Sequence, residues 1–363
     1  MATQTLYMER WCNMIAARTT SICNALCVGV DLHKTTLYAA GLCPTSGEVL
    51  EQRIACKCRD KILTFFQNLP RPHVVAIESM GSYRWLWELL EPVVEELHLA
   101  DAAQSRALAG RRIKTDREDA LNLAELLIAG RLPEAYVPPE HVRQLRSWTR
   151  QRNALSREHA RVLHRVKALL GQANRPGPAR LKADGLIRYL RQQNDKLPPD
   201  HVAQLWMASD RLSLIERQMD NAEREIQTRL DDERFRDDAE LLQTIPGVGP
   251  IVTATALAEI GQFQRFETRE AVVRYAGLDP RTFQSDQTVR HGRMSKAGSP
   301  DLRWVLQQAA WVGIRCDERP RRLCARITKR RGRKRAAAAV ARHILIWMWA
   351  MMRDRTAYGH RLA

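Results

Sequence analysis

Two short apolar runs in the first quarter of the chain each end in an acidic residue. Residues 27–30 lead directly to Asp31, and residues 73–77 lead to Glu78. Runs of this length, rich in valine and isoleucine, are typical of strands buried within a sheet. A carboxylate at the tip of a buried strand is costly unless it has a ligand or a charged partner. These two strands therefore predict an α/β sheet with an acidic site at its edge.

A second acidic pair lies at the start of a predicted helix. Thr115, followed three residues later by Glu118, forms the capping pattern that begins a helix, so Asp116 and Asp119 share one face of its first turn. Carboxylate oxygens brought together from separate elements are the ligands that a pair of Mg²⁺ ions prefers, and such sites act on phosphate esters. The alternative is structural, because acids in any first turn stabilise the helix dipole.

Strand and helix patterns alternate between residues 28 and 132. We expect strands at 28–31, 36–41, 49–55 and 74–78, and helices at 60–68, 83–97 and 116–129. This order predicts an α/β domain whose early strands form an antiparallel meander. Active sites of open α/β sheets lie at the carboxyl ends of strands, which is where Asp31 and Glu78 are expected.

The hydrophobic period then changes to that of long helices. Apolar residues recur every three or four positions over 145–169 and again over 205–226, although Arg152 and His159 interrupt the first stripe. We expect two long helices that pair, joined by a proline-rich connection with one short helix at most. Two interpretations stay open: a hairpin within one chain, or a dimerisation arm. Its arginine-rich faces are also suited to hold RNA or DNA.

Glycines and a basic run mark the C-terminal third. Gly247 and Gly249 precede a predicted helix at 251–260, an arrangement that brings backbone N–H groups close to a phosphate in helix-hairpin-helix elements. The alternative is a tight turn with no ligand. The basic run has nine cations and no acid, and predicts a phosphate contact, although a solvated segment would have the same composition. Its members are Arg321, Arg322, Arg326, Lys329, Arg330, Arg331, Arg333, Lys334 and Arg335.

Composition makes a polyanion the expected partner. The 363 residues are 45% hydrophobic, enough for two or three folded domains, and carry a net charge of +17 with a pI near 10.0. An anionic membrane is the rival partner, but the most apolar stretch, residues 336–352, contains Arg342 and His343 and predicts a buried helix. We expect no membrane contact. Positive charge without a sequence-specific motif favours phosphate backbones.

The N-terminus and the cysteines bear on location and metal content. Residues 1–26 lack the apolar core of a signal peptide, so we expect a cytoplasmic protein. The eight cysteines show no paired spacing typical of zinc sites, so free thiols in a reducing compartment are expected.

Several motifs together resemble a known family. The chain has VGVDLHK at 28–34, IESMGSY at 77–83 and KTDREDA at 114–120, then IPGVG at 245–249, YAGLDPR at 275–281, Ser285, MSKAG at 294–298 and Leu302-Arg303. In order and spacing these resemble the insertion-sequence family 110 transposases over nearly everything after Leu26. Asp286-Gln287 departs from the small or glycine-rich run that is commoner in the family after the serine.

The resemblance implies a fold and a site. It implies a RuvC-like ribonuclease H domain whose Asp-Glu-Asp-Asp metal site maps onto Asp31, Glu78, Asp116 and Asp119, and a second domain whose serine nucleophile is Ser285. The expected organisation is an N-terminal extension (1–26), the RuvC-like domain (27–138), a coiled-coil helical hairpin (139–235) and a mainly helical C-terminal serine domain with a helix-hairpin-helix element (236–363). The expected cofactor is Mg²⁺, as two ions, with Mn²⁺ able to substitute.

The resemblance also implies partners. Members of the family excise and insert their element with a structured non-coding bridge RNA that pairs with donor and target DNA, in the prokaryotic nucleoid. Exchange of two duplexes implies a homodimer or tetramer. Besides the basic run, the residues expected to contact nucleic acid are Lys34, Lys114, Gly247, Gly249, Arg281, Arg290, Arg293, Lys296 and Arg303.

Two other functions remain open from the residues themselves. A hydrolytic nuclease or junction resolvase would use the four acids and water, with no covalent intermediate, but leaves the arginines around Ser285 without a chemical task. A nucleic-acid-binding protein without catalysis would leave all four acids structural. Ser295 and Ser299 are the local rivals of Ser285 as nucleophile, and we interpret Ser295 as a helix cap.

Overall fold

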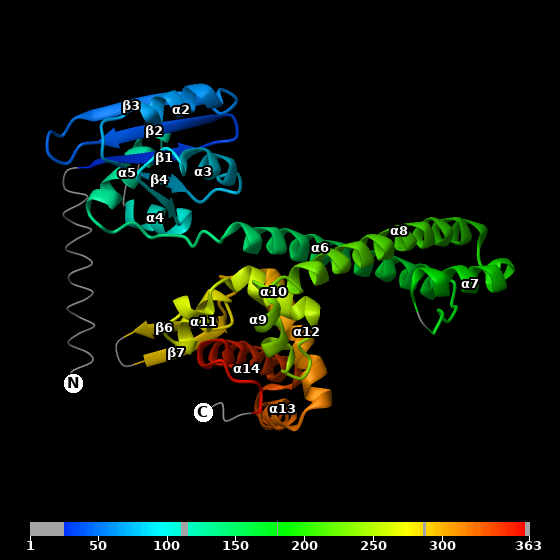
Figure 1. Ribbon diagram of the computed structural model, residues 1–363. Coiled ribbons are helices and arrows are strands. Elements are labelled where there is room, and N and C mark those ends of the chain that lie inside the picture. The colour runs from blue at the N-terminus through cyan, green and yellow to red at the C-terminus, as the bar shows by residue number, and fades with distance from the viewer. Residues whose placement is uncertain (1–24, 110–114, 180, 286–287, 360–363) are drawn as a thin grey trace. The chain divides into compact units, whose positions relative to one another are not determined.

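The computed structural model describes residues 25–109, 115–179, 181–285 and 288–359 (Figure 1). The chain divides into two compact units, Met1–Val137 and Pro138–Ala363, each with hydrophobic clusters of its own. Two predictions fall outside the described ranges: almost all of the N-terminal extension, and the nucleic-acid contact of Lys114.

The N-terminal unit is built on a five-stranded sheet of order β3-β2-β1-β4-β5. The first three strands, β1 (Leu26–Leu32), β2 (Thr36–Leu42) and β3 (Val49–Ala55), form the expected antiparallel meander. The central β1 also pairs in parallel with β4 (His73–Glu78), and β4 pairs in parallel with β5 (Glu96–Ala100). The sheet is therefore mixed, with its two acid-bearing strands side by side at the centre.

Helices cover both faces of this sheet. On one face, α2 (Arg59–Gln67) and α3 (Arg84–Leu90) share a hydrophobic cluster with alternate residues of β1 and β4. On the other face, α5 (Asp116–Ile128) packs against the intervening residues, while α4 (Ala102–Ala109) follows β5 (Figure 1). Burial on both faces explains why the two strands are continuously apolar. The predicted mixed α/β character of this part of the chain is confirmed.

One predicted element is wrong. The helix expected at 83–97 ends at Leu90, and the chain instead forms the edge strand β5. Pro92 cannot continue a helix because it lacks an N–H group and its ring disfavours helical geometry in the residue before it. The released segment then pairs with β4 and satisfies backbone groups that this strand would otherwise leave exposed.

Two long helices begin the C-terminal unit. α6 (Glu140–Gln172) and α8 (Pro199–Leu230) pack through a shared apolar cluster, and the connection holds α7 (Ala183–Gln193) and a 3₁₀ turn. The two residues that interrupt the apolar stripe of α6 are paired across this interface. Arg152 donates to Glu223 at 2.7 Å, and the His159 Nε2 lies 3.0 Å from the Glu216 carboxylate.

The rest of this unit is mainly helical within the described residues, as predicted, and includes a β-hairpin. Its elements are α9 (Arg236–Gln243), α10 (Pro250–Ile260), η2 (Phe263–Arg265), α11 (Arg269–Tyr275), β6 (Pro280–Ser285), β7 (Thr288–Met294), α12 (Pro300–Cys316), α13 (Glu318–Arg331) and α14 (Arg333–Asp354). The apolar side of α14 is buried in the core, which confirms the predicted C-terminal helix. In the described part of the chain, none of the helices has the length and hydrophobicity needed to span a bilayer.

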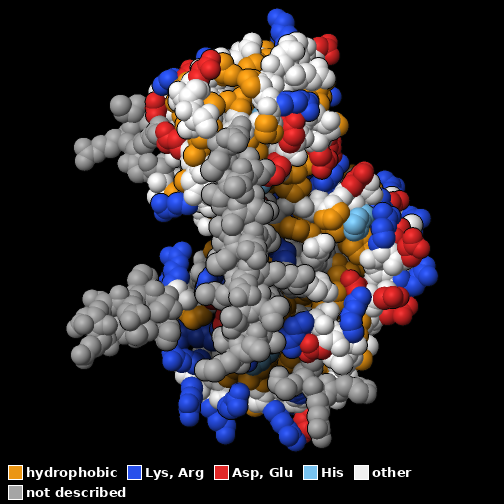
Figure 2. Space-filling model, turned by 60° about the vertical axis from the view of Figure 1, so that its left-hand side comes forward, with side chains coloured by type: hydrophobic (Ala, Val, Ile, Leu, Met, Phe, Trp, Pro, Cys, Tyr) orange, Lys and Arg blue, Asp and Glu red, His pale blue; other side chains and the backbone are white. Residues whose placement is uncertain are grey.

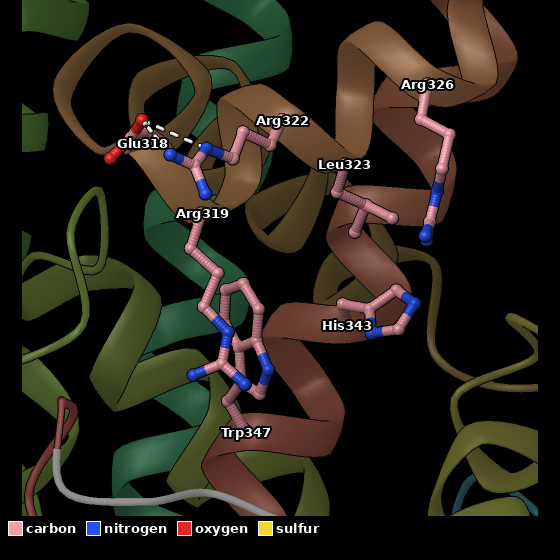
Figure 3. A pocket seen from close by; sticks show the side chains of 7 residues that line it. All are labelled: Glu318, Arg319, Arg322, Leu323, Arg326, His343 and Trp347. Carbon is pink, nitrogen blue, oxygen red and sulfur yellow. Dashed lines mark hydrogen bonds and ion pairs between the residues drawn. The ribbon is translucent and has the colours of Figure 1, made fainter.

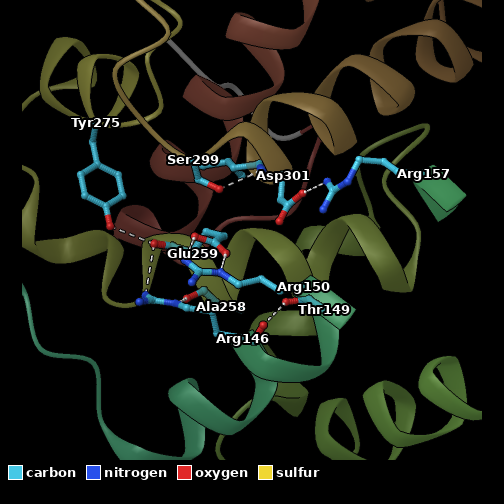
Figure 4. A network of polar contacts seen from close by, with 10 residues as sticks. Arg146, Thr149, Arg150, Arg157, Ala258, Glu259, Tyr275, Ser299 and Asp301 are labelled. Carbon is cyan, nitrogen blue, oxygen red and sulfur yellow. Dashed lines mark hydrogen bonds and ion pairs between the residues drawn. The ribbon is translucent and has the colours of Figure 1, made fainter. Parts of the chain in front are cut away.

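Ion pairs between exposed arginines and buried carboxylates hold α6 against the helices of this core (Figure 4). The Arg150 guanidinium donates to both carboxylate oxygens of Glu259 in α10, at 2.8 and 3.1 Å, and Glu259 is only 3% exposed. Arg157 pairs with the buried Asp301 of α12, and Arg146 donates to the Ala258 carbonyl at 2.7 Å. Close geometry in these pairs offsets the cost of desolvating the two carboxylates.

Gly29 permits the closest backbone approach in the N-terminal unit. A Cβ atom at this position of β1 would lie 1.9 Å from the Ala120 carbonyl oxygen and 2.8 Å from Leu123 Cβ, both in α5. Real Cβ atoms do not make such contacts, so α5 rests directly on the backbone of β1 only because residue 29 has no side chain.

We predict that Gly29→Ala destabilises the protein by roughly 2–4 kcal/mol, because α5 must shift off the sheet or the strand must bend. The measurement is thermal and urea unfolding followed by circular dichroism. Gly81→Ala is the matched control, since a Cβ there meets nothing within 4 Å. Equal stability of the two variants would contradict the close packing described for α5.

Candidate active site

The alternation of side chains along β1 and β4 points two acids to the same face. Asp31 shares its face of β1 with Cys27, which packs against α5, and Glu78 shares its face of β4 with Val74 and Ala76. Val30 is paired with Ile77 at the end of the β1–β4 register, so Asp31 and Glu78 are the next neighbours along the two strands. Both acids are buried, at 3% and 9% exposure.

The first turn of α5 brings the other two acids to this place. The Thr115 hydroxyl accepts a hydrogen bond from the Glu118 N–H at 3.2 Å, which confirms the predicted N-cap. Asp116 and Asp119 follow in the first turn, immediately before Ala120, the residue whose carbonyl faces Gly29. The site is thus assembled by the contact between α5 and β1.

His33, which sequence analysis left without a role, joins the acids. Its Nε2 atom forms a hydrogen bond of 3.0 Å with Asp116 Oδ1 and lies 3.2 Å from Asp31 Oδ2. Among the described residues, Asp31, His33 and Asp116 form a group whose ligand atoms all lie within 4.8 Å of one another. The signal for His33 was its place two residues after Asp31, just beyond the strand.

The electrostatics of the site are those of crowded carboxylates. Burial, the largest cause, raises the pKa of Asp31 from 3.8 to about 6. The charges of Glu78, Asp119 and Asp116 act in the same direction, and His33 opposes them. The other three predicted acids are therefore close enough to Asp31 to interact with it electrostatically.

A cation fits this arrangement. Asp31 Oδ2 is buried and accepts no hydrogen bond from any described residue. A buried carboxylate oxygen of this kind is costly unless a ligand completes it, and a divalent ion supplies what the oxygen lacks. Two arginines lie at the rim: Arg106 donates to Glu78 at 3.0 Å, and Arg53 lies 3.7 Å from Asp116. Lys34, another predicted contact, is exposed just beyond His33.

Ser285 is the last residue of β6, in the hairpin with β7. Its backbone pairs with that of Thr288 across the tip. The side chains of residues 282–291, including Ser285 and Arg290, and the whole of residues 286–287 lie outside the described part of the structure. Arg281, within β6, and Lys296, just after β7, are both exposed.

The interpretation of Ser295 as a helix cap is wrong. Its hydroxyl donates to the Asp279 carboxylate, and its N–H donates to the Asp279 carbonyl at 2.8 Å, so it ties together the base of the hairpin. The N-cap of α12 is Ser299, whose hydroxyl accepts from the Leu302 N–H at 3.3 Å. Sequence pattern placed the cap four residues too early because both serines precede the same helix.

Four arginines gather beside the base of the hairpin. Arg293, Arg331, Arg335 and Arg342 line a cavity of about 630 Å³ with apolar residues of β6, β7 and α14. Three of them were predicted contacts. Arg342 was not, although it stood out in the sequence as a charge within an otherwise apolar helix. Uncompensated guanidinium groups around one cavity form a site suited to phosphate.

The basic run spans two helices separated at Gly332. Lysine and arginine side chains project from the lower edge of Figure 2, at the height where Figure 1 places α13. Two members have partners within the protein: Arg321 donates to the Arg315 carbonyl at 2.8 Å, and Arg322 pairs with Glu318 at 2.6 Å. The remaining members, from Arg326 to Arg335, are all exposed.

Beside this run lies a cavity of about 450 Å³ between α13 and α14 (Figure 3). Arg319 lies over the Trp347 ring, with its guanidinium carbon 4.9 Å from the ring centroid. Arg326 and His343 line the opposite side, and burial together with the nearby arginines lowers the pKa of His343. The wall of this cavity is therefore cationic and aromatic.

Two of three further predicted contacts, Gly247 and Arg303, have structural explanations. Gly247 has φ of +90°, and a Cβ there would lie 2.5 Å from the Ala309 carbonyl in α12, so this glycine serves packing. Gly249, in contrast, is the exposed N-cap of α10 and faces open space. Arg303 donates to the carbonyls of Ala276 and Gly298, and burial lowers its pKa.

Comparisons with known proteins identify the family. The model of the DEDD-type IS110 transposase, described as "Transposase", matches residues 28–175, which include all four acids. The model "Transposase IS116/IS110/IS902 family" matches residues 239–325, which include Ser285. The chain belongs to the IS110 family of transposases. It is therefore a DNA-processing enzyme of mobile elements, and a DEDD-type site suggests a divalent metal.

Relatives span most of the transposase. The putative transposase y4rJ of Sinorhizobium fredii is 28% identical, with 90% of this chain and 91% of the relative covered. The transposase for insertion sequence element IS1328 of Yersinia enterocolitica is 23% identical, with 80% and 84% covered. The transposase for insertion sequence element IS1533 of Leptospira borgpetersenii is 24% identical, with 78% and 84% covered.

The raised pKa of Asp31 predicts that the free energy of unfolding depends on pH. The folded chain holds this proton more tightly than the unfolded chain, so the contribution to stability is complete below pH 3.8 and is lost as the pH rises through about 6. In buffer with EDTA, Asp31→Asn should match the wild type near pH 4 and exceed it by up to about 3 kcal/mol at pH 7.5.

The measurement is urea unfolding of both proteins at several pH values between 4 and 7.5. Asp60→Asn is the control, because Asp60 is an exposed acid in the first turn of α2. A stability difference between Asp31→Asn and wild type that does not grow with pH would contradict the burial of an ionisable Asp31.

Proposed function

We propose that this transposase cleaves and rejoins DNA strands through a serine nucleophile, Ser285, assisted by divalent metal held at Asp31, Glu78, Asp116 and Asp119. The observation that carries the proposal is the buried Asp31 oxygen that accepts no hydrogen bond from any described residue and lies among three further carboxylates. Such a cluster is unfavourable in a metal-free protein and is explained by a cation that binds there. We propose Mg²⁺ as the ion, because it is a hard cation that prefers carboxylate oxygens, with Mn²⁺ able to substitute.

The proposed chemistry assigns separate tasks to the protein's groups. A bound divalent ion would neutralise negative charge that builds up on the scissile phosphate. The Ser285 hydroxyl attacks the phosphorus and loses its proton, and a bond forms from Oγ to phosphorus while the bond to the 3′ oxygen breaks. The products are a 5′-phosphoserine ester and a free 3′-hydroxyl. Attack by the 3′-hydroxyl of another strand reverses these steps and releases the serine.

The arginines near the hairpin support this assignment. Arg293, Arg331, Arg335 and Arg342 line one cavity beside the strands that carry Ser285. Guanidinium groups bind phosphate oxygens in a bidentate manner and stabilise charge in the transition state. A hydrolytic nuclease, the second candidate, needs only the acids of the N-terminal unit and leaves this cationic cavity without a task.

The proposal extends to a guide and to an assembly. The net charge of +17 and the exposed basic run favour backbone contacts, so we propose that a structured bridge RNA supplies the sequence specificity by pairing with donor and target DNA. A homodimer or tetramer would supply the several active sites that strand exchange needs. We assign the protein to the nucleoid of a prokaryotic cell.

The finer fold assignments belong to the same proposal. We propose that residues 27–138 form a RuvC-like domain, 139–235 a coiled-coil hairpin, and 236–363 the serine domain, after an extension at 1–26. The mixed sheet supports the first, and the paired α6 and α8 support the second. For a helix-hairpin-helix contact, the exposed N-terminus of α10 at Gly249 is the better candidate than the packed Gly247.

We predict that Ser285 becomes covalently joined to DNA and that Ser285→Ala loses both cleavage and the adduct. The reason is that a phosphoserine ester stores the energy of the cut bond, whereas hydrolysis dissipates it. The test combines protein, candidate guide RNA, Mg²⁺ and end-labelled DNA, stops the reaction with denaturant, and follows label that migrates with protein. Ser295→Ala is the matched control and should keep the adduct.

The acid variants separate the two candidate enzymes from a binding protein. Asp31→Asn, Glu78→Gln, Asp116→Asn and Asp119→Asn should each abolish cleavage and leave nucleic-acid binding intact, because amides are nearly isosteric but poor ligands for Mg²⁺. Efficient cleavage by the wild type without an adduct would favour the hydrolytic nuclease. An adduct that persists in Ser285→Ala would assign the nucleophile elsewhere.

We predict that the basic run supplies sequence-independent backbone contacts. Replacing Lys329, Arg330, Arg331 and Lys334 with glutamine should reduce the slope of log affinity against log salt by about 3 to 4, since each lost phosphate contact removes about 0.9. The measurement is fluorescence anisotropy with duplexes of unrelated sequence. An unchanged slope would place the contacts elsewhere.

The matched control changes the net charge equally at another place. It replaces four exposed cations of the connection between α6 and α8 with glutamine, and its slope should fall by less than one unit. The four are Lys182, Arg188, Arg191 and Lys196.

A further inference from the structure

We propose that His33 is a ligand of the metal ion held by Asp31 and Asp116, and that its imidazole makes this site favour Mn²⁺ over Mg²⁺. The inference rests on the proposed metal site and adds a nitrogen ligand to its four acids. Mg²⁺ prefers oxygen ligands, whereas imidazole suits transition metals.

The separations of the ligand atoms fit a shared ion. His33 Nε2 lies 3.0 Å from Asp116 Oδ1 and 3.2 Å from Asp31 Oδ2. Neighbouring ligands of an octahedral ion with bonds of about 2.1 Å are roughly 3 Å apart. The three side chains therefore already have the spacing of adjacent ligands on one ion.

Burial supplies an independent observation. Asp31 is 3% exposed, and its Oδ2 atom, the one nearest His33, forms no hydrogen bond with any described residue. The imidazole lies 3.2 Å from this oxygen, but its Nε2 atom forms its hydrogen bond with Asp116 Oδ1. An ion between the three groups would complete the coordination of that oxygen.

Hydrogen bonds hold the backbone of His33 in place beside the acids. The His33 N–H donates to the Thr36 carbonyl at 2.9 Å, and the Cys56 thiol donates to the His33 carbonyl at 3.6 Å. The residue is thus held from the β2 side and from the end of β3. Its side chain remains 46% exposed, so ions have access from solvent.

The rival explanation is that His33 is a cationic partner of the two carboxylates that competes with metal. The two explanations predict opposite signs. Removal of a ligand weakens binding of the ion that uses it, whereas removal of a competing cation strengthens binding of both ions. The sign of the change in affinity therefore decides between them.

The experiment measures Mn²⁺ and Mg²⁺ binding to the full chain by isothermal titration calorimetry, and ¹⁴N coupling to bound Mn²⁺ by pulsed electron paramagnetic resonance. The wild type should bind Mn²⁺ at least about tenfold more tightly than Mg²⁺ and show imidazole ¹⁴N coupling. His33→Ala should lose about tenfold in Mn²⁺ affinity, change less than about threefold for Mg²⁺, and lose the coupling.

Two variants serve as controls. His33→Lys retains a cation beside the carboxylates and should also lose the ¹⁴N coupling. His164→Ala removes an exposed histidine of α6 and should behave as the wild type.

The outcomes separate this inference from the proposed function. If Asp31→Asn abolishes Mn²⁺ binding but His33→Ala retains the ¹⁴N coupling, or binds both ions more tightly, His33 is not a ligand and the metal site stands. If the wild type binds neither ion, both the proposed metal site and the role of His33 are wrong.

Discussion

The contact between the backbone of β1 and the first turns of α5 is the constraint on which the acidic site depends. Because residue 29 is glycine, the Ala120 carbonyl can lie where a side chain would otherwise stand. This closeness places Asp116 and Asp119, which precede Ala120 on the helix, beside Asp31 on the strand. A helix held even one side chain farther away would separate the acids beyond the reach of one ion.

The same contact makes the site electrostatically unfavourable in the absence of a ligand. Folding buries Asp31 beside like charges, and the raised pKa measures the cost. His33, Arg53 and Arg106 offset part of it from the rim. Ion binding to the folded state, but not to the unfolded chain, would recover the rest, so metal and stability are linked.

Sequence patterns predicted the elements that neighbouring residues determine. They missed the features that depend on contacts with distant parts of the chain. The strands ending in Asp31 and Glu78 and the cap at Thr115 follow from periodicity and capping residues, and the structure has them. Strand β5 was missed because its short apolar pattern gains a strand's hydrogen bonds only beside β4. The contact of His33 with Asp116 joins residues 83 positions apart, which no local pattern encodes.

The arginines of the C-terminal unit divide by the partner that each has. Arg150 and Arg157 are paired with the buried carboxylates of Glu259 and Asp301, so they hold α6 against α10 and α12 and part of their charge is neutralised. The exposed members of the basic run have few acids near them. Net charge counts both groups equally. The arginines of the basic run attract phosphate more strongly, because a carboxylate beside an arginine weakens its attraction for phosphate. Arg331 and Arg335 of the basic run line a cavity together with residues of the β6–β7 hairpin, which carries Ser285.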